Sequence, residues 1–212
     1  MNALTKDSVL ISSQKMQESE ELSLNIQEEA LKAVQSIKKG RVLLYPSDTL
    51  WGLGCDITNQ SAVARIYEIK QRDPKKPFIL LVNSIQMLKR YIVMIHPRVE
   101  TLLMHHVQPL TLIYQSNGQL PSYIVPEDET VAIRVTKDPF CRAVITQLNQ
   151  PLISTSANSA GSKTPITFDE IEDRILEMTD DIADRRLEKN NTGQPSVIGT
   201  FNHKGELDFI RD

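Results

Sequence analysis

The chain has 212 residues and a net charge of −3, with 40% hydrophobic and 24% charged residues. These values predict a folded globular protein and exclude a disordered chain. They also exclude a strongly basic protein that binds nucleic acid through a large positive net charge. The length fits one large domain, and the two cysteines, Cys55 and Cys141, exclude a disulfide scaffold. This cysteine usage favours a cytoplasmic protein. No apolar run approaches 18 residues, so we expect no contact with a membrane.

The predicted elements indicate one domain over residues 23–212, preceded by a polar lead over 1–22 that we expect to be flexible. In chain order they are a helix over 26–37, a strand over 42–45, a turn-rich stretch over 46–59, a helix over 59–72, a strand over 78–82, helices over 85–92 and 97–106, strands over 111–114 and 131–135, a helix over 139–148, a strand over 152–154, a helix opened by a capping box at Thr167–Glu170, and strands over 196–199 and 207–210. Helices alternate with strands, but none separates 111–114 from 131–135. We therefore predict an α/β (α+β) domain with a mixed sheet and flanking helices.

A first candidate site follows the strand over 42–45, where Ser47, Asp48 and Thr49 come directly after apolar residues. Gly52 and Gly54 allow the backbone to approach a ligand closely. Ligands commonly bind where strands end in an open sheet. The same pattern also fits a turn with structural glycines, so both interpretations stay open here.

A second candidate site is the cationic end of the helix over 59–72. Lys70 and Arg72 are followed by Lys75 and Lys76. Cations stabilise a helix C-terminus through its dipole, which would make this segment a plain surface end. They also suit a polyphosphate, because Arg offers a bidentate fork and Lys a compact charge.

Two further segments carry polar residues at or near strands. Alternation along the segment after Ile153 places Ser154, Ser156 and Asn158 on one face. That face predicts either a nucleotide cradle or a serine-rich loop. Arg134 interrupts an apolar strand, so it must face solvent, pair with a carboxylate or bind an anion.

Taken together, these segments resemble the YrdC-like family, the TsaC-type L-threonylcarbamoyladenylate synthases. The family motifs Tyr-Pro-Thr-Asp/Glu-Thr-x-Tyr-Gly-Leu-Gly, Lys-x-Arg, Ala-Val-Arg-Val and Ser-x-Asn are matched, in the same order, by Tyr45–Gly54, Lys70 with Arg72, Ala132–Val135, and Ser156 with Asn158. The resemblance runs from about residue 24 to residue 212. It indicates the short, single-domain version of the family.

The resemblance implies a twisted open sheet with a concave, positively charged nucleotide cavity. It implies a nucleotidyltransferase that joins L-threonine, bicarbonate or CO2, and ATP with Mg²⁺, and that yields threonylcarbamoyl-AMP and pyrophosphate. The product would pass to a TsaD-type transferase and its accessory proteins, which modify adenosine 37 of tRNA. Contact of the chain itself with tRNA, or with double-stranded RNA generally, would be weak.

The same resemblance assigns roles by position. Lys70 and Arg72 are expected to be catalytic, because they would offset charge as pyrophosphate leaves. The residues expected to bind ATP or AMP are Lys70, Arg72, Lys76, Thr130, Ser156, Asn158, Thr164 and Arg211. The residues expected to bind threonine are Thr49, Arg134, Ser154 and Ser196, with Arg134 on the carboxylate. No protein side chain is assigned to a metal.

Three departures from the family pattern leave a second hypothesis open. Leu81 stands where many members carry a His that touches threonine. The segment Val107–Thr111 replaces a Pro-Gly-Pro-x-Thr sequence, and Pro195–Ile198 has one hydroxyl fewer than usual. The alternative is a non-catalytic RNA- or nucleotide-binding paralogue of the same fold, although the intact pair of Ser156 and Asn158 favours the synthase.

Overall fold

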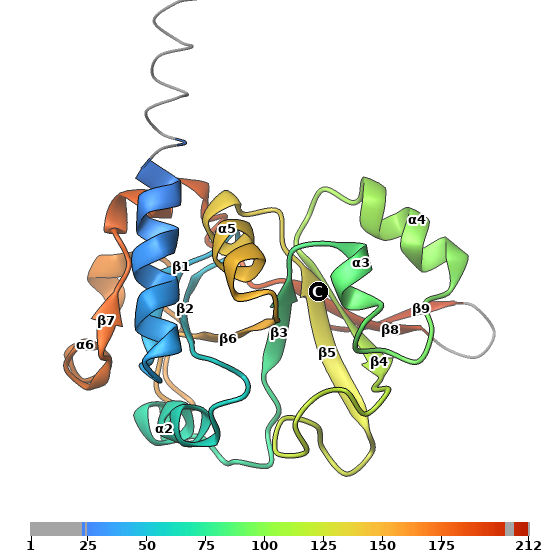
Figure 1. Ribbon diagram of the computed structural model, residues 1–212, viewed down its shortest axis with the longest axis horizontal. Coiled ribbons are helices and arrows are strands. Elements are labelled where there is room, and N and C mark those ends of the chain that lie inside the picture. The colour runs from blue at the N-terminus through green and yellow to red at the C-terminus, as the bar shows by residue number, and fades with distance from the viewer. Residues whose placement is uncertain (1–22, 24, 202–205, 212) are drawn as a thin grey trace, which may run out of the picture.

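The computed structural model describes residues 23, 25–201 and 206–211, so the lead predicted over 1–22 lies outside the described part of the chain. The described residues form one nine-stranded sheet in the order β7-β1-β2-β6-β3-β5-β4-β8-β9 (Figure 1). Three neighbouring pairs are parallel (β1–β7, β3–β5 and β4–β8) and the others are antiparallel, which confirms the predicted mixed sheet. The strands are β1 (Leu43–Pro46), β2 (Trp51–Gly54), β3 (Ile79–Val82), β4 (Leu110–Gln115), β5 (Thr130–Val135), β6 (Leu152–Ser156), β7 (Asp181–Ile182), β8 (Val197–Phe201) and β9 (Leu207–Arg211).

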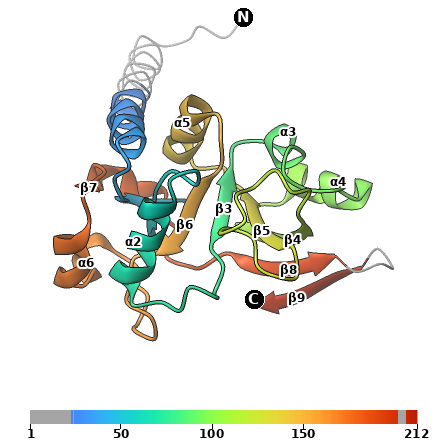
Figure 2. The ribbon, with the colours of Figure 1, turned by 60° about the horizontal axis from the view of Figure 1, so that its bottom comes forward.

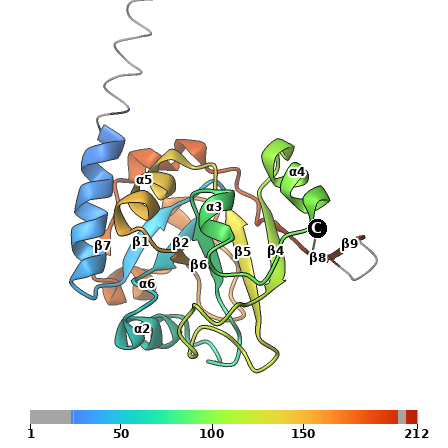
Figure 3. The same cartoon turned by 45° about the vertical axis from the view of Figure 1, so that its right-hand side comes forward.

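Helices flank this sheet, as the sequence predicts. They are an N-terminal helix over 25–38, α2 (Gln60–Lys70), α3 (Ile85–Leu88), α4 (Pro97–His105), α5 (Pro139–Leu148) and α6 (Asp173–Met178), with short 3-10 turns η1 (Phe168–Glu170) and η2 (Arg185–Asn190). In Figure 2 the N-terminal helix, α5, α3 and α4 lie along one side of the sheet, while α2 and α6 lie near its β1–β2–β6 half. Figure 3 shows β8 and β9 at the opposite end of the sheet from β7. No helix in the described ranges is long and apolar enough to cross a membrane.

The prediction of a turn-rich stretch over 46–59 is wrong for residues 51–54, which form the buried strand β2. This strand lies between β1 and β6, where space for side chains is small. A Cβ added at Gly54 would lie 2.5 Å from the Ile153 carbonyl oxygen and 2.8 Å from Cε1 of Tyr45. The glycine is therefore required by close packing inside the sheet rather than by a turn.

The end of α2 carries Lys70 as predicted, but Arg72, which was predicted to end the same helix, lies beyond it. The Asn59 side chain caps the start of this helix by accepting from the Ala62 amide at 3.0 Å. Lys70 is its last residue, and Gln71 then adopts a left-handed conformation with φ of 48°. Such a residue ends a helix abruptly, and Arg72 therefore leaves the helix in a new direction.

The capping box predicted at Thr167–Glu170 is wrong. The Thr167 side chain makes no capping hydrogen bond, and only a 3-10 turn follows it. Glu170 instead accepts from the Ile166 amide at 3.1 Å. The α-helix begins later, at Asp173.

The packing around β2 leads to a stability prediction. We expect Gly54→Ala to lower the free energy of unfolding by about 3 kcal/mol, because its Cβ would overlap the backbone of β6. Gly52→Ala, in the same strand, is the matched control, since its Cβ would lie 3.2 Å from the Thr155 carbonyl oxygen. Chemical denaturation of both variants tests this, and an equal loss in the two would contradict it.

Candidate active site

A small cavity of about 110 Å³ opens where β2, β5 and β6 meet the segment before β8. It gathers all four residues predicted to bind threonine and two of those predicted to bind the nucleotide. Its lining is formed by Thr49, Leu50, Trp51, Gly52, Arg134, Ser154, Thr155, Ser156, Thr164, Pro195 and Ser196. Clefts for drug-sized ligands are about 300–1,000 Å³, so this cavity suits a group of amino-acid size.

Strand register explains why polar residues from distant segments meet here. Residues that pair directly across strands point to the same face of a sheet. Gly52 pairs with Ser156, and Ser154 pairs with Ile79 of β3. Ile79 in turn pairs with Ala132, two residues before Arg134 on β5. The serines of β6 and Arg134 therefore share one face.

Arg134 is buried, with 3% of its surface exposed, which excludes the solvent-facing alternative that the sequence left open. Its Nη1 donates to Thr49 Oγ1 at 3.1 Å, and its Nη2 lies 3.1 Å from Asp48 Oδ1. Its Nε is buried without a hydrogen-bond partner among the described residues. The arginine thus pairs with a carboxylate, which is one of the alternatives that the sequence left open.

The wall opposite β6 comes from the segment that leads into β8. The amides of Thr192 and Gly193 donate to the carbonyls of Asp48 and Thr49 at 3.3 and 3.1 Å. The segment then brings Ser196 to the cavity, where its Oγ lies 2.8 Å from Thr111 Oγ1. The turn after β1 and the segment before β8 are far apart in sequence, and these main-chain hydrogen bonds hold them together.

Lys70 does not line the cavity, and it is almost fully buried, at 2% exposed. Its Nζ donates to the carbonyl of Asn158 at 2.7 Å and to the carbonyl of Ser156. Burial, assisted by the cation of Arg72, lowers the pKa of Lys70 to about 8, against the opposing influence of Glu172. The ammonium thus ties the end of β6 to the end of α2.

The loop after β6 is organised by Asn158. Its Oδ1 accepts from Ser156 Oγ at 2.6 Å, and its Nδ2 donates to the carbonyls of Ser159 and Ser162, both at 2.9 Å. Ser156 and Asn158 therefore meet as predicted, but the Asn158 amide faces its own loop. Its observed contacts shape the loop around the cavity.

The remaining predicted nucleotide residues do not line this cavity. Arg72 donates from Nη2 to the Pro77 carbonyl at 3.0 Å and from Nε to the Lys76 carbonyl at 3.3 Å. Burial lowers the pKa of Arg72. Lys76 is exposed, and Thr130 Oγ1 donates to Asp128 at 2.9 Å. For Arg211 the backbone belongs to β9, and its side chain lies outside the described part of the chain.

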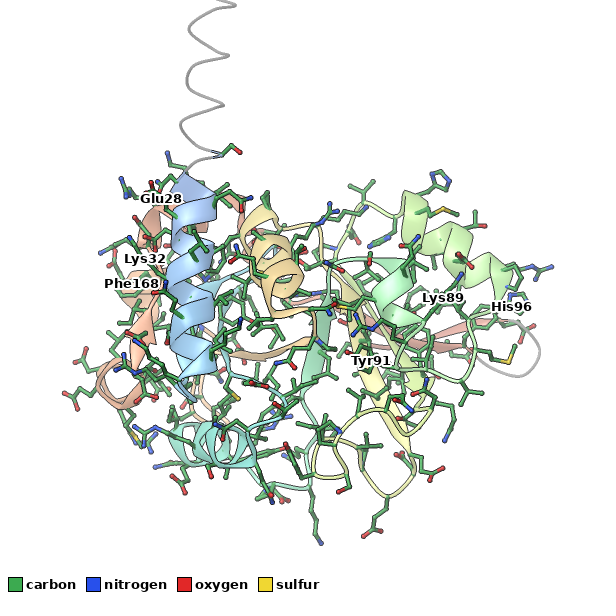
Figure 4. All side chains as sticks on the ribbon, in the orientation of Figure 1. Glu28, Lys32, Lys89, Tyr91, His96 and Phe168 are labelled. Carbon is green, nitrogen blue, oxygen red and sulfur yellow. The ribbon has the colours of Figure 1, made fainter. Side chains whose placement is uncertain are left out.

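Three residues to which the sequence assigned no binding role also shape the cavity. Asp48 pairs with Arg134, Thr111 contacts Ser196, and Trp51 forms part of the lining. Phe168, labelled in Figure 4, packs edge-on against Trp51 with ring centroids 5.0 Å apart. The acidic residue beside Thr49 was a usable signal, since a buried arginine needs a carboxylate.

The position of Lys70 leads to a prediction on pH. We expect its ammonium to titrate near pH 8, well below its ordinary pKa of 10.5. Between these values the unfolded chain binds more protons than the folded one, so the free energy of unfolding should rise with pH across that window. NMR titration of isotope-labelled lysine signals, assigned with Lys70→Met, measures the first effect. The variant should also lose the rise in stability, and a Lys70 midpoint above pH 10 would contradict the prediction.

Comparison with known proteins identifies relatives of the chain. The Sua5/YciO/YrdC family, described as "Telomere recombination", matches residues 35–212. A threonylcarbamoyl-AMP synthase of Pseudoalteromonas translucida is 31% identical over 170 residues, which are 78% of this chain and 89% of that protein. One of Vibrio cholerae is 36% identical over 142 residues, which are 66% of this chain and 76% of that protein.

Solved structures share the fold. Escherichia coli YciO superposes with a TM-score of 0.71 at 25% identity, covering 88% of this chain and 91% of that chain. Sua5 of P. abyssi, solved in complex with L-threonine, gives 0.72 at 23% identity, covering 82% of this chain and 51% of that chain. The match over residues 35–212 and the identities above 30% to curated relatives establish that the chain belongs to the Sua5/YciO/YrdC family.

Proposed function

We propose that the chain is a threonylcarbamoyl-AMP synthase, which joins L-threonine, bicarbonate and ATP into threonylcarbamoyl-AMP. The observation that carries this proposal is the gathering of Thr49, Arg134, Ser154 and Ser196 around one cavity of amino-acid size. The curated relatives that match most of the chain bear this name. A buried cation with an unused donor, surrounded by hydroxyls, suits a small polar substrate with a carboxylate.

In this proposal the substrate carboxylate binds the free side of Arg134. The guanidinium has five N–H donors, of which one contacts Thr49 and another faces Asp48. A carboxylate on the remaining donors would form charge-assisted hydrogen bonds. The hydroxyls of Ser154 and Ser196 line the same space and can bind the amino and hydroxyl groups of threonine.

The reaction then needs two bond-forming steps. The amino group of threonine takes up the carbon of bicarbonate, with loss of water, and forms a carbamate. A carbamate oxygen attacks the α-phosphorus of ATP, and the bond to the departing pyrophosphate breaks. Positioning and charge stabilisation supply most of the catalysis in such transfers, so no covalent intermediate with the protein is needed.

The nucleotide would lie next to this cavity, against Ser156, Thr164 and the end of α2. Lys70 donates to the Ser156 carbonyl, and its charge there would favour phosphates that bind against Ser156. Arg72 now holds neutral carbonyl oxygens, and phosphate oxygens would replace them as stronger acceptors. Lys76, Thr130 and Arg211 would complete nucleotide binding at the periphery.

Magnesium would enter with the nucleotide. Mg²⁺ is usually bound through substrate phosphates and one or two carboxylates. The described residues contain no group of three or more His, Cys, Asp and Glu side chains arranged to hold a metal. The donor set therefore fits an ion that ATP carries as its own complex.

The product belongs to a cytoplasmic route of tRNA modification in this proposal. Threonylcarbamoyl-AMP is a mixed anhydride, so a second enzyme, of the TsaD type, must transfer its acyl group to adenosine 37 of tRNA. The exposed Lys75 and Lys76 could touch RNA weakly, whereas the net charge of −3 argues against tight binding.

The reaction itself is the first test. Purified protein with ATP, Mg²⁺, L-threonine and bicarbonate should release pyrophosphate and form the adenylate. Omission of threonine, or of bicarbonate in CO2-free buffer, should reduce the rate to background. The absence of pyrophosphate with all substrates present would contradict the proposal and favour a non-catalytic paralogue.

The phosphate-binding role has its own test. We expect Arg72→Ala and Lys70→Met each to lower kcat/KM for ATP by about 100-fold, because each removes a charge that stabilises the departing phosphates. Lys38→Ala, on the exposed face of the N-terminal helix, is the control. Wild-type rates in the Arg72 variant would exclude that residue from the reaction.

A further inference from the structure

We propose that Asp48 is a positioning residue, which orients the Arg134 guanidinium for the carboxylate of the substrate. The inference rests on the proposed function and adds a residue to it. Asp48 is not part of the cavity lining, whereas Arg134 is. Any effect of Asp48 on the substrate must therefore pass through the arginine.

The contacts of Asp48 hold its carboxylate in one orientation. Its Oδ2 accepts from Thr136 Oγ1 at 3.1 Å and from the Lys137 amide at 3.3 Å. Its Oδ1 is thereby turned toward Arg134, whose Nη2 lies at 3.1 Å. The carboxylate is thus anchored on one oxygen and faces the arginine with the other.

The pairing is close but incomplete. Oδ1 of Asp48 and Nε of Arg134 are both buried and without a hydrogen-bond partner in the described part of the chain. The contact between Nη2 and Oδ1 is thus an ion pair that lacks hydrogen-bond geometry. A carboxylate that served only to neutralise the arginine would be expected to form the bidentate pair. The observed contacts within the described part of the chain thus leave part of the guanidinium's hydrogen-bonding capacity unused.

Because Arg134 and Asp48 are both largely buried, the orientation of the guanidinium depends on the carboxylate. The side chains of Arg134 and Asp48 are 4% and 15% exposed. Without its partner, the long and flexible arginine side chain would turn toward other acceptors to escape desolvation. A neutral residue at position 48 would therefore misplace the donors that the substrate needs. The side chain of Asp48 contacts Thr136, Lys137 and Arg134, none of which is assigned to the nucleotide, so nucleotide binding should change little.

The experiment compares KM for threonine with KM for ATP in Asp48→Asn, by pyrophosphate release. The asparagine side chain would retain the shape and could still accept from Thr136, so KM is measured on a folded enzyme. We expect KM for threonine to rise about 10- to 100-fold, with KM for ATP within about twofold of wild type. Asp48→Glu, which keeps the charge, should recover most of the loss. Asp56→Asn, a carboxylate in the turn after β2 that caps Thr58, is the matched control.

The double variant separates positioning from a structural role. In an Arg134→Ala background, Asp48→Asn should have little further effect on KM for threonine, because the residue through which it acts is gone. An unchanged KM in Asp48→Asn, or an equal loss in both backgrounds, would overturn the inference. Should Asp48→Asn fail to fold, Thr136→Val replaces it, since it removes one of the two donors to Oδ2 and leaves both charges. A wild-type protein inactive with all substrates would instead overturn the proposed function.

Discussion

The burial of one guanidinium inside the sheet is the constraint on which the cavity depends. An ionised group taken out of water costs several kcal/mol unless partners replace its hydration. Arg134 therefore requires Asp48 and Thr49 at their observed places, which dictates the conformation of the turn between β1 and β2. The carbonyls of that turn in turn hold the segment before β8. Since a buried ion pair stabilises a fold little more than apolar residues would, its presence here is better explained by binding than by stability.

A second buried cation shapes the other side of the site. Lys70 forms no ion pair with a carboxylate among the residues that the structure describes; its ammonium instead binds the carbonyls of Ser156 and Asn158. Glu172 stands behind this loop, where it accepts from Ser159 Oγ at 2.7 Å. Two cations thus lie within the walls of one site in a chain whose net charge is −3. The positive charge is therefore concentrated around Arg134 and Lys70. Such a local charge suits the binding of small anions better than the binding of a long polyanion.

Elements with a local sequence signal could be predicted from the sequence. Predictions were wrong or incomplete where contacts between distant parts of the chain determine the structure. Periodicity and the cations placed Lys70 at the end of α2 correctly. The strand β2 was missed because Trp-Gly-Leu-Gly has few strand-forming residues, and its structure comes from pairing with the distant β6. The sequence left three environments open for Arg134, since nothing local shows that Asp48 folds against it. Motif order anticipated which residues gather in the cavity, but it could not anticipate that Arg72 turns to the carbonyls of its own loop, because that depends on side-chain conformation.

The environment of Arg134 also bears on Leu81, which stands where many members of the family carry a His. Leu81 pairs with Arg134 across β3 and β5 and is fully buried. A leucine there offers no donor to a substrate, so the part of recognition that a His could supply must come from other groups. Because directly paired residues share a face, Leu81 adds an apolar side chain to the face of the sheet that carries Arg134. Electrostatic interactions strengthen as the local dielectric falls, so a carboxylate on the free side of Arg134 would be bound more strongly than at a wetter site. In the proposed function, the burial of Arg134 would therefore partly offset the polar contact that a His at position 81 could supply.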